Sequence, residues 1–380
     1  MQLLEKDSES KDNLQKMIDT LEKANVASLT GRMSTFDHEQ VVFCQDKSTG
    51  LKAIIAVHNT VLGPAVGGTR MWAYGSEEDA ITDVLRLSRG MTYKNALAGL
   101  NIGGGKAVII GDARTDKNEA LLRRFGKFVD GLGGKYITAE DVGISTKDME
   151  FVKMETDHVV GLPDYLNGGG DPSPVTAYGV YMGMKASVKE LTGNDSLAGK
   201  KIVVQGVGHV GEYLVSHLVK ENAEVVIADI YEDRVKAVVT KYGVRAIDVK
   251  DVYDEKMDIY SPCALGATIN DETLAKLGCS IICGAANNQL SNEQIHGAEV
   301  QKKGILYAPD YLVNAGGIIN CYWEIIGYSR EAALAQAEGI YAKTLEIFNK
   351  SKSENIPTYL AANLLAEARI QAIGKVKLSY

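Results

Sequence analysis

Two lysines that lie twelve residues apart are the first candidates for chemistry in this sequence. Lys94 falls on a stretch with helical periodicity, whereas Lys106 follows three consecutive glycines at 103–105. One ammonium group can bind a carboxylate, while a second, crowded and partly desolvated, loses its proton more readily and serves as a base. Because glycines let a ligand approach the backbone, the pair predicts a site that binds a carboxylate and moves a proton.

A glycine-rich turn is the second candidate. An apolar run at 201–205 leads into Gly206-Val207-Gly208-His209-Val210-Gly211 and then into a helical pattern. Gly206 permits the tight turn, Gly208 lets the backbone approach a pyrophosphate, and Gly211 lets the helix pack on the strand. The next strand ends at Asp229, whose carboxylate would accept hydrogen bonds from the adenosine ribose and repel a 2′-phosphate. This context predicts an NAD site.

The elements that would position these residues alternate between strand and helix. Apolar runs at 41–44 and 51–57 flank a turn and predict a hairpin, and apolar residues at three- and four-residue intervals predict a helix over 77–98. A second helix is expected at 119–132, and single strands are expected at 107–110, 136–139 and 158–161.

A segment with three glycines and two prolines, 167–174, marks an expected connection between domains. Beyond it, helices and short apolar strands alternate, with strands at 201–205, 224–229, 257–260, 280–283 and 305–307. That order is typical of a parallel, doubly wound sheet. Two further helical patterns, 330–349 and 359–373, end the chain.

Length and composition restrict the class of protein. A chain of 380 residues exceeds the usual size of one core, so two domains are expected. The net charge of −8 argues against a nucleic acid partner, and no apolar run reaches the length that spans a bilayer. The polar start lacks the apolar core of a signal peptide, which predicts a cytoplasmic protein. The five cysteines show no metal-ligand spacing, and no metal site is predicted.

Several motifs, in order, resemble the glutamate/leucine/phenylalanine/valine dehydrogenase family, and leucine dehydrogenases most. The motifs are the segments 67–70, 90–106, 138–143, 174–179 and 314–317. The resemblance implies an α/β fold with a cleft between two domains. Residues 1–168 would form the substrate-binding and oligomerisation domain, and 169–349 a doubly wound Rossmann domain for NAD. The C-terminal helix, 350–380, would pack back on the first domain, and residues before about 27 are expected to form an amphipathic or partly disordered helix.

The activity implied by the resemblance is the reversible, NAD-dependent oxidative deamination of a branched-chain L-amino acid. The products would be the 2-oxo acid, ammonia and NADH, and the enzyme would be a homo-oligomer, an octamer by resemblance. Lys94 would hold the α-carboxylate, Lys106 would activate water, and Asp141 would shuttle protons. Gly67 and Gly68 would contact the substrate through the backbone, and Thr176 and Asn288 would hold the nicotinamide and its ribose.

Two positions bear on the choice of amino acid. Glutamate-specific members carry a lysine just before the paired glycines and a serine seven residues after the asparagine of the 314–317 motif, where this chain has Val66 and Cys321. A buried γ-carboxylate without a partner would cost several kcal/mol, which disfavours glutamate. Val66, Met91 and Ile318 would line an apolar pocket, although Cys321 departs from the valine usual in leucine dehydrogenases.

Leucine, valine and isoleucine are not ranked by these residues. A phenylalanine dehydrogenase on the same scaffold is the main alternative. An NAD-sensing protein without catalytic activity is an alternative from another class, which the set of Lys94, Lys106 and Asp141 disfavours because binding NAD requires none of them.

Overall fold

The computed structural model describes residues 28–377, so the helix expected before residue 27 lies outside the described residues. The chain divides into two compact units. Among the described residues, the first unit holds 28–92, 103–144 and 151–158, and the second unit holds 93–102, 145–150 and 159–377. None of the helices in the described part of the chain is long and apolar enough to cross a membrane.

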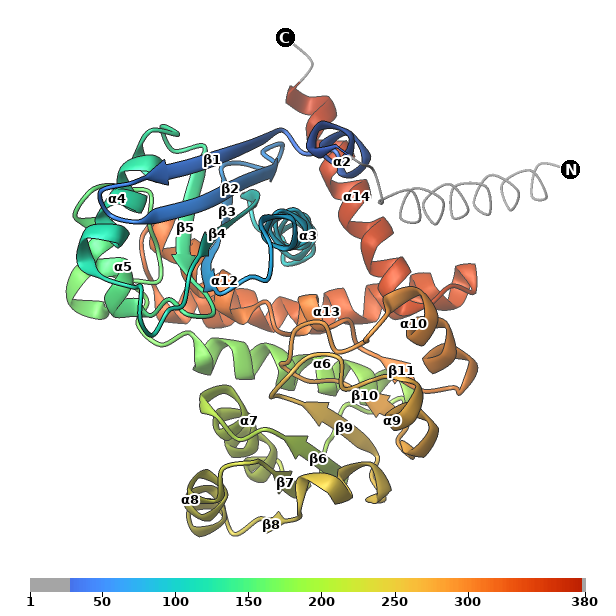
Figure 1. The fold of residues 1–380 in the computed structure, drawn as a ribbon. Coiled ribbons are helices and arrows are strands. Elements are labelled where there is room, and N and C mark those ends of the chain that lie inside the picture. The colour runs from blue at the N-terminus through green and yellow to red at the C-terminus, as the bar shows by residue number, and fades with distance from the viewer. Residues whose placement is uncertain (1–27, 378–380) are drawn as a thin grey trace, which may run out of the picture. The chain divides into compact units, whose positions relative to one another are not determined.

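The first unit is built on a mixed five-stranded sheet (Figure 1). Its strands, in spatial order, are β1 (Gln40–Asp46), β2 (Leu51–Asn59), β4 (Gly103–Ile110), β3 (Ala65–Trp72) and β5 (Tyr136–Glu140). The β1–β2 hairpin is antiparallel, as predicted, and β2 pairs antiparallel with β4. β3 lies between β4 and β5 and runs parallel to both, so the same ends of these three strands share one edge.

Helix α3 (Glu77–Leu97) covers one face of this sheet. Ser76 accepts a hydrogen bond from the backbone N–H of Asp79, as a capping serine does, and acidic residues fill the first turn. A buried cluster joins the helix to the sheet through Ala80, Ile81, Val84, Leu85, Ile54, Ala56 and Val108. The other helices of this part of the chain are α2 (Leu29–Phe36), α4 (Glu119–Asp130) and α5 (Thr146–Lys153), of which α5 is divided between the two units.

Two details of the first unit differ from the sequence prediction. The strand expected at 158–161 is wrong: His158 accepts one backbone hydrogen bond from Thr138, after which Gly161 turns away with φ 75°. β3 was not predicted, because Gly67 and Gly68 interrupt its apolar alternation. The strand pattern in the sequence was therefore weakest at β3, which lies between β4 and β5 in the sheet.

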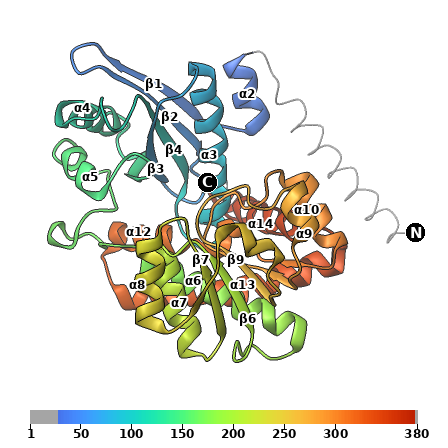
Figure 2. The ribbon, with the colours of Figure 1, turned by 60° about the horizontal axis from the view of Figure 1, so that its bottom comes forward.

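The second unit contains the predicted parallel, doubly wound sheet, and Figure 2 shows three of its strands side by side. Its six strands, in spatial order, are β11 (Leu306–Tyr307), β10 (Ile281–Ile282), β9 (Ile259–Pro262), β6 (Lys201–Gln205), β7 (Glu224–Ala228) and β8 (Arg245–Ala246). All neighbours pair parallel. The strand order reverses between β6 and β9, which is where such sheets bind ligands.

Helices account for most of the remaining second unit. Its first long helix, α6 (Ser173–Thr192), packs on α13, and Gly179 admits the side chain of Ile340. The others are α7 (His209–Lys220), α8 (Glu232–Tyr242), α9 (Asp271–Lys276), α10 (Glu293–Lys302), α11 (Asp310–Val313), α12 (Gly316–Ile326), α13 (Arg330–Glu354) and α14 (Thr358–Lys377), with short 3₁₀ turns at Asp164–Leu166 and Val249–Asp254. α14 contacts α13, α10 and β11, and Arg369 donates to the carbonyls of Ala96 and Leu100. The domain boundary expected at 168 stays a prediction.

Candidate active site

Lys106 and Asp141 form an ion pair in the first unit. Lys106 lies on β4, and Asp141 directly follows β5, two strands that flank β3. The distance from Lys106 Nζ to Asp141 Oδ2 is 3.0 Å, and the side chains are 7% and 24% exposed. The structure therefore brings together the two residues predicted to be catalytic, in a partly desolvated place where a proton can pass between them.

Arg70 is a second cation on the same carboxylate, and the sequence prediction gave it no role. Its Nε lies 3.0 Å from Asp141 Oδ2. Burial raises the pKa of Asp141, but the charges of Lys106 and Arg70 outweigh it and hold the pKa below its usual value. An arginine inside a buried strand was the signal that could have identified it.

Close packing of strands explains the paired glycines. A Cβ on Gly67 would overlap the carbonyl oxygen of Gly105, and one on Gly68 would overlap that of Glu140. The carbonyl of Gly67 also accepts a hydrogen bond of 2.6 Å from the Tyr136 hydroxyl. These contacts require glycine at both positions, and the expected substrate contact of Gly67 and Gly68 stays a prediction.

The residues predicted to line the apolar pocket are divided between the two units. Val66 is fully buried on β3, and Met91 Cγ lies 3.2 Å from where a Cβ on Gly67 would be. Ile318 and Cys321 lie one helical turn apart on α12 in the second unit, Ile318 buried and Cys321 partly exposed. Within the first unit, Met91 thus lies beside Gly67, the residue that follows Val66 on β3.

Lys94 contacts Asn287, the neighbour of Asn288, which was predicted to hold the nicotinamide and its ribose. Its Nζ donates to Asn287 Oδ1 at 3.2 Å, and the same oxygen accepts from Asn314 Nδ2 at 2.8 Å. Asn288 is exposed with a left-handed backbone (φ 52°), and its carbonyl accepts from the N–H of Ala267. All these contacts lie in the second unit, and the expected joint site of Lys94 and Lys106 stays a prediction.

The three glycines of the glycine-rich turn differ in the space around them. Gly206 has φ 104°, and a Cβ there would lie 2.7 Å from Ala264 Cβ, while one on Gly211 would overlap the carbonyl of Gly206. In contrast, a Cβ on Gly208 would meet only Arg234 Nη1, at 3.8 Å. Gly208 is the N-cap of α7 and has no side chain to bond the first N–H groups, which suits an anion.

Other residues of the turn differ in exposure. Val207 is buried and Val210 is half-buried. The side chain of His209 is 83% exposed and lies 3.8 Å from Asp171 Oδ2. Asp229, just after β7, accepts the N–H of Val207 at 2.8 Å and that of Tyr231 at 2.9 Å. These residues fit NAD: the turn would face the pyrophosphate and Asp229 the ribose.

Thr176 lies in the first turn of α6, beside the start of α12. Its hydroxyl donates to the carbonyl of Pro172 at 3.0 Å, so it does not cap the helix. A Cβ on Gly317 would lie 3.4 Å from Thr176 Oγ1, which places the threonine against the glycines of the 314–317 motif. Its expected contact with the nicotinamide stays a prediction.

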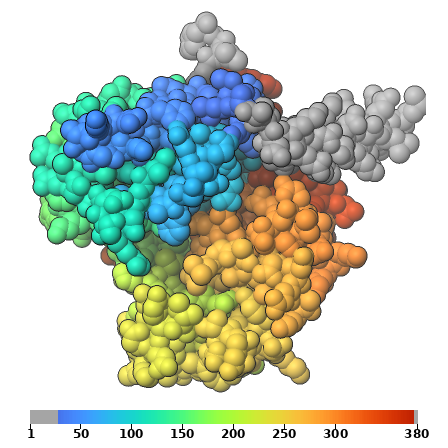
Figure 3. All heavy atoms as spheres, in the orientation of Figure 1, coloured from blue at the N-terminus to red at the C-terminus, as the bar shows by residue number. Residues whose placement is uncertain are grey.

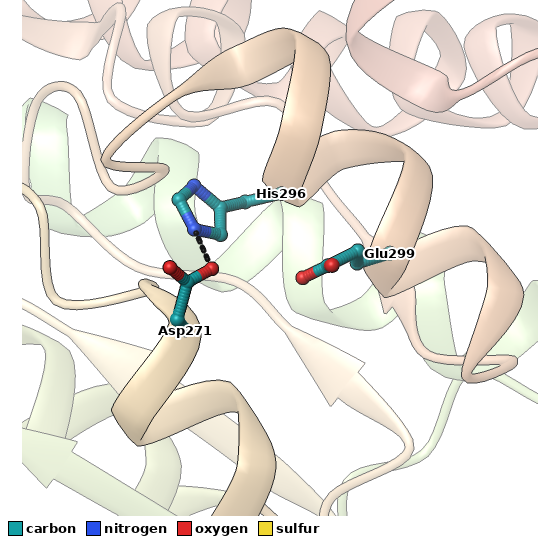
Figure 4. A group of neighbouring side chains, drawn as sticks. All are labelled: Asp271, His296 and Glu299. Atoms are coloured by element: carbon teal, nitrogen blue, oxygen red, sulfur yellow. Dashed lines mark hydrogen bonds and ion pairs between the residues drawn. The ribbon is translucent and has the colours of Figure 1, made fainter.

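One group of potential metal ligands occurs among the described residues, away from the predicted motifs in sequence. Figure 4 shows Asp271 on α9 facing His296 and Glu299 on α10, with their ligand atoms within 4.8 Å of one another. His296 is buried and its Nε2 lies 3.1 Å from Asp271 Oδ1, whereas both acidic residues are exposed. This hydrogen bond links the two helices.

Comparisons with known proteins agree with the fold and the site. The family model described as Glu/Leu/Phe/Val dehydrogenase, dimerisation domain, matches residues 38–158. The model described as Glutamate/Leucine/Phenylalanine/Valine dehydrogenase matches residues 168–230 and 226–378. The sequence is 54% identical to leucine dehydrogenase of Thermoactinomyces intermedius over 348 residues, 92% of this chain and 95% of the relative.

Two further relatives are similar over nearly the same length. Leucine dehydrogenase of Geobacillus stearothermophilus is 54% identical over 345 residues, 91% of this chain and 94% of the relative. The crystal structure of L-tryptophan dehydrogenase from Nostoc punctiforme has a TM-score of 0.82 and 44% identity, and covers 91% of this chain and 99% of that one. The resemblance and the two-domain α/β fold predicted from the sequence are confirmed, and the chain belongs to the Glu/Leu/Phe/Val dehydrogenase family as an amino acid dehydrogenase.

Proposed function

We propose that this enzyme catalyses the reversible, NAD-dependent oxidative deamination of a branched-chain aliphatic L-amino acid, leucine, valine or isoleucine. The observation that carries the proposal is the Lys106–Asp141 ion pair, in which the lysine side chain is buried and the carboxylate is 24% exposed. The relatives at 54% identity are leucine dehydrogenases. Val66 and Ile318 are apolar, which suits an aliphatic substrate side chain. Neither could form a hydrogen bond or an ion pair with the γ-carboxylate of glutamate.

The cofactor we propose is NAD, which accepts a hydride from the substrate Cα when bound. Gly206, Gly208 and Gly211 would hold its pyrophosphate, and Asp229 its adenosine ribose. Asp229 accepts the N–H groups of Val207 and Tyr231 beside the turn, where its side chain would disfavour the 2′-phosphate of NADP.

The chain's own residues would then carry the substrate and its protons. Lys94 would bind the α-carboxylate. Lys106 would take a proton from the water that attacks the oxidised carbon, and Asp141, 3.0 Å from Lys106 Nζ, would pass a proton to the nitrogen that leaves as ammonia. The site thus needs one base and one relay, both of which the pair supplies.

An aromatic amino acid is the second candidate substrate. Cys321 is smaller than the valine usual in leucine dehydrogenases, and a structural relative at 44% identity is an L-tryptophan dehydrogenase. One methylene group in such a pocket contributes only about 1–3 kcal/mol to substrate discrimination, so a small change in a residue that lines the pocket can alter the substrate preference.

We further propose a homo-oligomer, with an octamer as the expected size, located in the cytoplasm. The family model over residues 38–158 is described as a dimerisation domain. Strand β1 is the outer strand of its sheet and carries exposed Phe43, and the blue hairpin lies at the surface in Figure 3. All five cysteines lie within the described residues, and none forms a disulfide there, which suits a reducing compartment.

The test is NADH formation by the purified protein with leucine, valine, isoleucine, phenylalanine and glutamate at alkaline pH. We expect the highest kcat/KM for an aliphatic substrate and little activity with glutamate. A preference for phenylalanine would support the aromatic alternative. No NADH formation with any of these amino acids, with NAD binding retained, would overturn the proposal in favour of an NAD sensor.

A further inference from the structure

We propose that Arg70 is a positioning residue, which holds the Asp141 carboxylate against Lys106 and is itself held by Asp83 and Tyr74. The proposal rests on the catalytic roles proposed above for Lys106 and Asp141. It assigns a function to three residues of the first unit that the Lys106–Asp141 pair does not include.

The first support is the shared oxygen. Arg70 Nε and Lys106 Nζ each lie 3.0 Å from Asp141 Oδ2. Arg70 projects from β3, the strand between the two that carry Lys106 and Asp141. A carboxylate held from two directions by cations on adjacent strands has little freedom to turn away from the lysine.

The second support is the anchor behind the arginine. Arg70 Nη1 lies 2.8 Å from Asp83 Oδ2 on α3, and the Tyr74 hydroxyl donates to the same oxygen at 2.8 Å. Asp83 is 15% exposed. A planar guanidinium can direct Nε to one carboxylate and Nη1 to another, which a lysine ammonium cannot reproduce with the same geometry. Arg70 therefore spans Asp141 and Asp83 in a fixed orientation.

The third support is electrostatic. Apart from burial, the groups that shift the pKa of Asp141 are Lys106 from β4 and Arg70 from β3. The hydroxyls of Tyr136 on β5 and of Tyr74 also face Asp141, burial together with the charge of Asp141 raises the pKa of both, and Asp83 lies behind Arg70. Burial raises the pKa of Asp141, and the two cations lower it further than burial raises it. Without Arg70, Lys106 alone would oppose burial, so the pKa of Asp141 would rise.

Two variants of Arg70 test the role through turnover. We expect Arg70→Met to lower kcat about 10- to 100-fold, with little change in KM for NAD, because the relay is misplaced while cofactor residues are untouched. The acidic limb of the kcat profile should move up by about one pH unit. Arg70→Lys, which keeps the charge, should restore part of kcat and most of the limb position.

A matched control is Arg124→Met. Arg124 Nε lies 3.0 Å from Asp46 Oδ2 on the same unit, the same contact as that of Arg70 but with a half-exposed arginine. Its kcat and pH profile should equal those of the wild type. An unchanged kcat and acidic limb in Arg70→Met, in an active wild-type enzyme, would overturn the proposal.

A stability measurement makes the test independent of turnover. The changes in the free energy of unfolding of Arg70→Met, Asp141→Asn and the double variant, measured by denaturant at pH 7, should be non-additive. The reason is that each single change breaks the same Arg70–Asp141 contact. Additive effects would overturn the proposal. If the wild type oxidises no amino acid, the proposed function fails, while this cycle still decides whether Arg70 and Asp141 are coupled.

Discussion

The carboxylate of Asp229 accepts the backbone N–H of Val207 at 2.8 Å, so the residue expected to select the cofactor also supports the glycine-rich turn. Its other oxygen accepts the N–H of Tyr231 at 2.9 Å. Both functions depend on a side chain that only accepts hydrogen bonds. Cofactor selection and loop geometry are therefore linked through one group.

We accordingly expect Asp229→Asn to weaken NAD binding about 10- to 100-fold, the usual effect of losing hydrogen bonds to a charged group. The ratio of NADP to NAD affinity should rise, because the repulsion of a 2′-phosphate is removed. Titration of both cofactors by fluorescence measures the ratio, and Asp233→Asn, an exposed residue of α8, is the control. An unchanged ratio would contradict the proposed role of Asp229.

Alanine at two glycines of the turn should have opposite effects. Gly208→Ala adds a Cβ whose nearest neighbour is Arg234 Nη1 at 3.8 Å, so the melting temperature should hold while NAD affinity falls by about tenfold or more. Gly211→Ala places a Cβ on the carbonyl of Gly206 and should destabilise the fold by about 1–3 kcal/mol. Calorimetry with and without NAD separates the two effects. Equal NAD affinity for Gly208→Ala and wild type would count against a pyrophosphate at this turn.

Lys106→Met should lower kcat by about 10²- to 10⁴-fold, the contribution typical of a general base. The fold should persist because Arg70 still neutralises Asp141, and NAD binding should be retained because the cofactor residues are unchanged. Steady-state kinetics and NAD titration measure both, with Lys52→Met, an exposed residue of the otherwise mostly buried β2, as control. Turnover equal to that of the wild type would remove Lys106 from the mechanism.

Acid should destabilise the first unit through two buried histidines. Burial lowers the pKa of His38 from 6.5 to about 4, and burial together with His38 lowers that of His58 to about 3. Their rings are 4.7 Å apart, and His58 bonds Thr92 and the carbonyl of Phe36. Because the unfolded chain takes up protons first, stability should fall as pH drops from about 6.5 toward 4, by about 2 kcal/mol per histidine at pH 5.

Denaturant midpoints between pH 7 and pH 5 check this expectation. His38→Gln and His58→Gln should each flatten the pH dependence, whatever their effect at pH 7. His209→Gln, at an exposed position, should leave the slope as in the wild type. A wild-type midpoint that does not change over this range would contradict the expectation. It would show that folding does not lower the pKa values of these two histidines.

Local features were predictable from the sequence because they depend on neighbouring residues. The helix predicted over 77–98 follows from apolar periodicity, and the turn at 206–211 from glycines between a strand and a helix. The alternation of strands and helices beyond residue 174 predicted the parallel sheet. The motifs also predicted the family, which the comparisons confirm.

Contacts between distant strands were decided by the tertiary structure. Arg70 meets Asp141 only because β3 runs parallel between β4 and β5, a pairing that no local pattern contains. The same pairing leaves room only for glycine at 67 and 68. Those glycines interrupt the apolar alternation of β3, so the strand was not predicted from the sequence. Apart from β3 and the strand wrongly expected at 158–161, the sequence by itself determined most element types and the predicted site residues, since these depend on side-chain chemistry over a few positions. Which charges share an oxygen depends on strand order and register, and only the folded chain sets these.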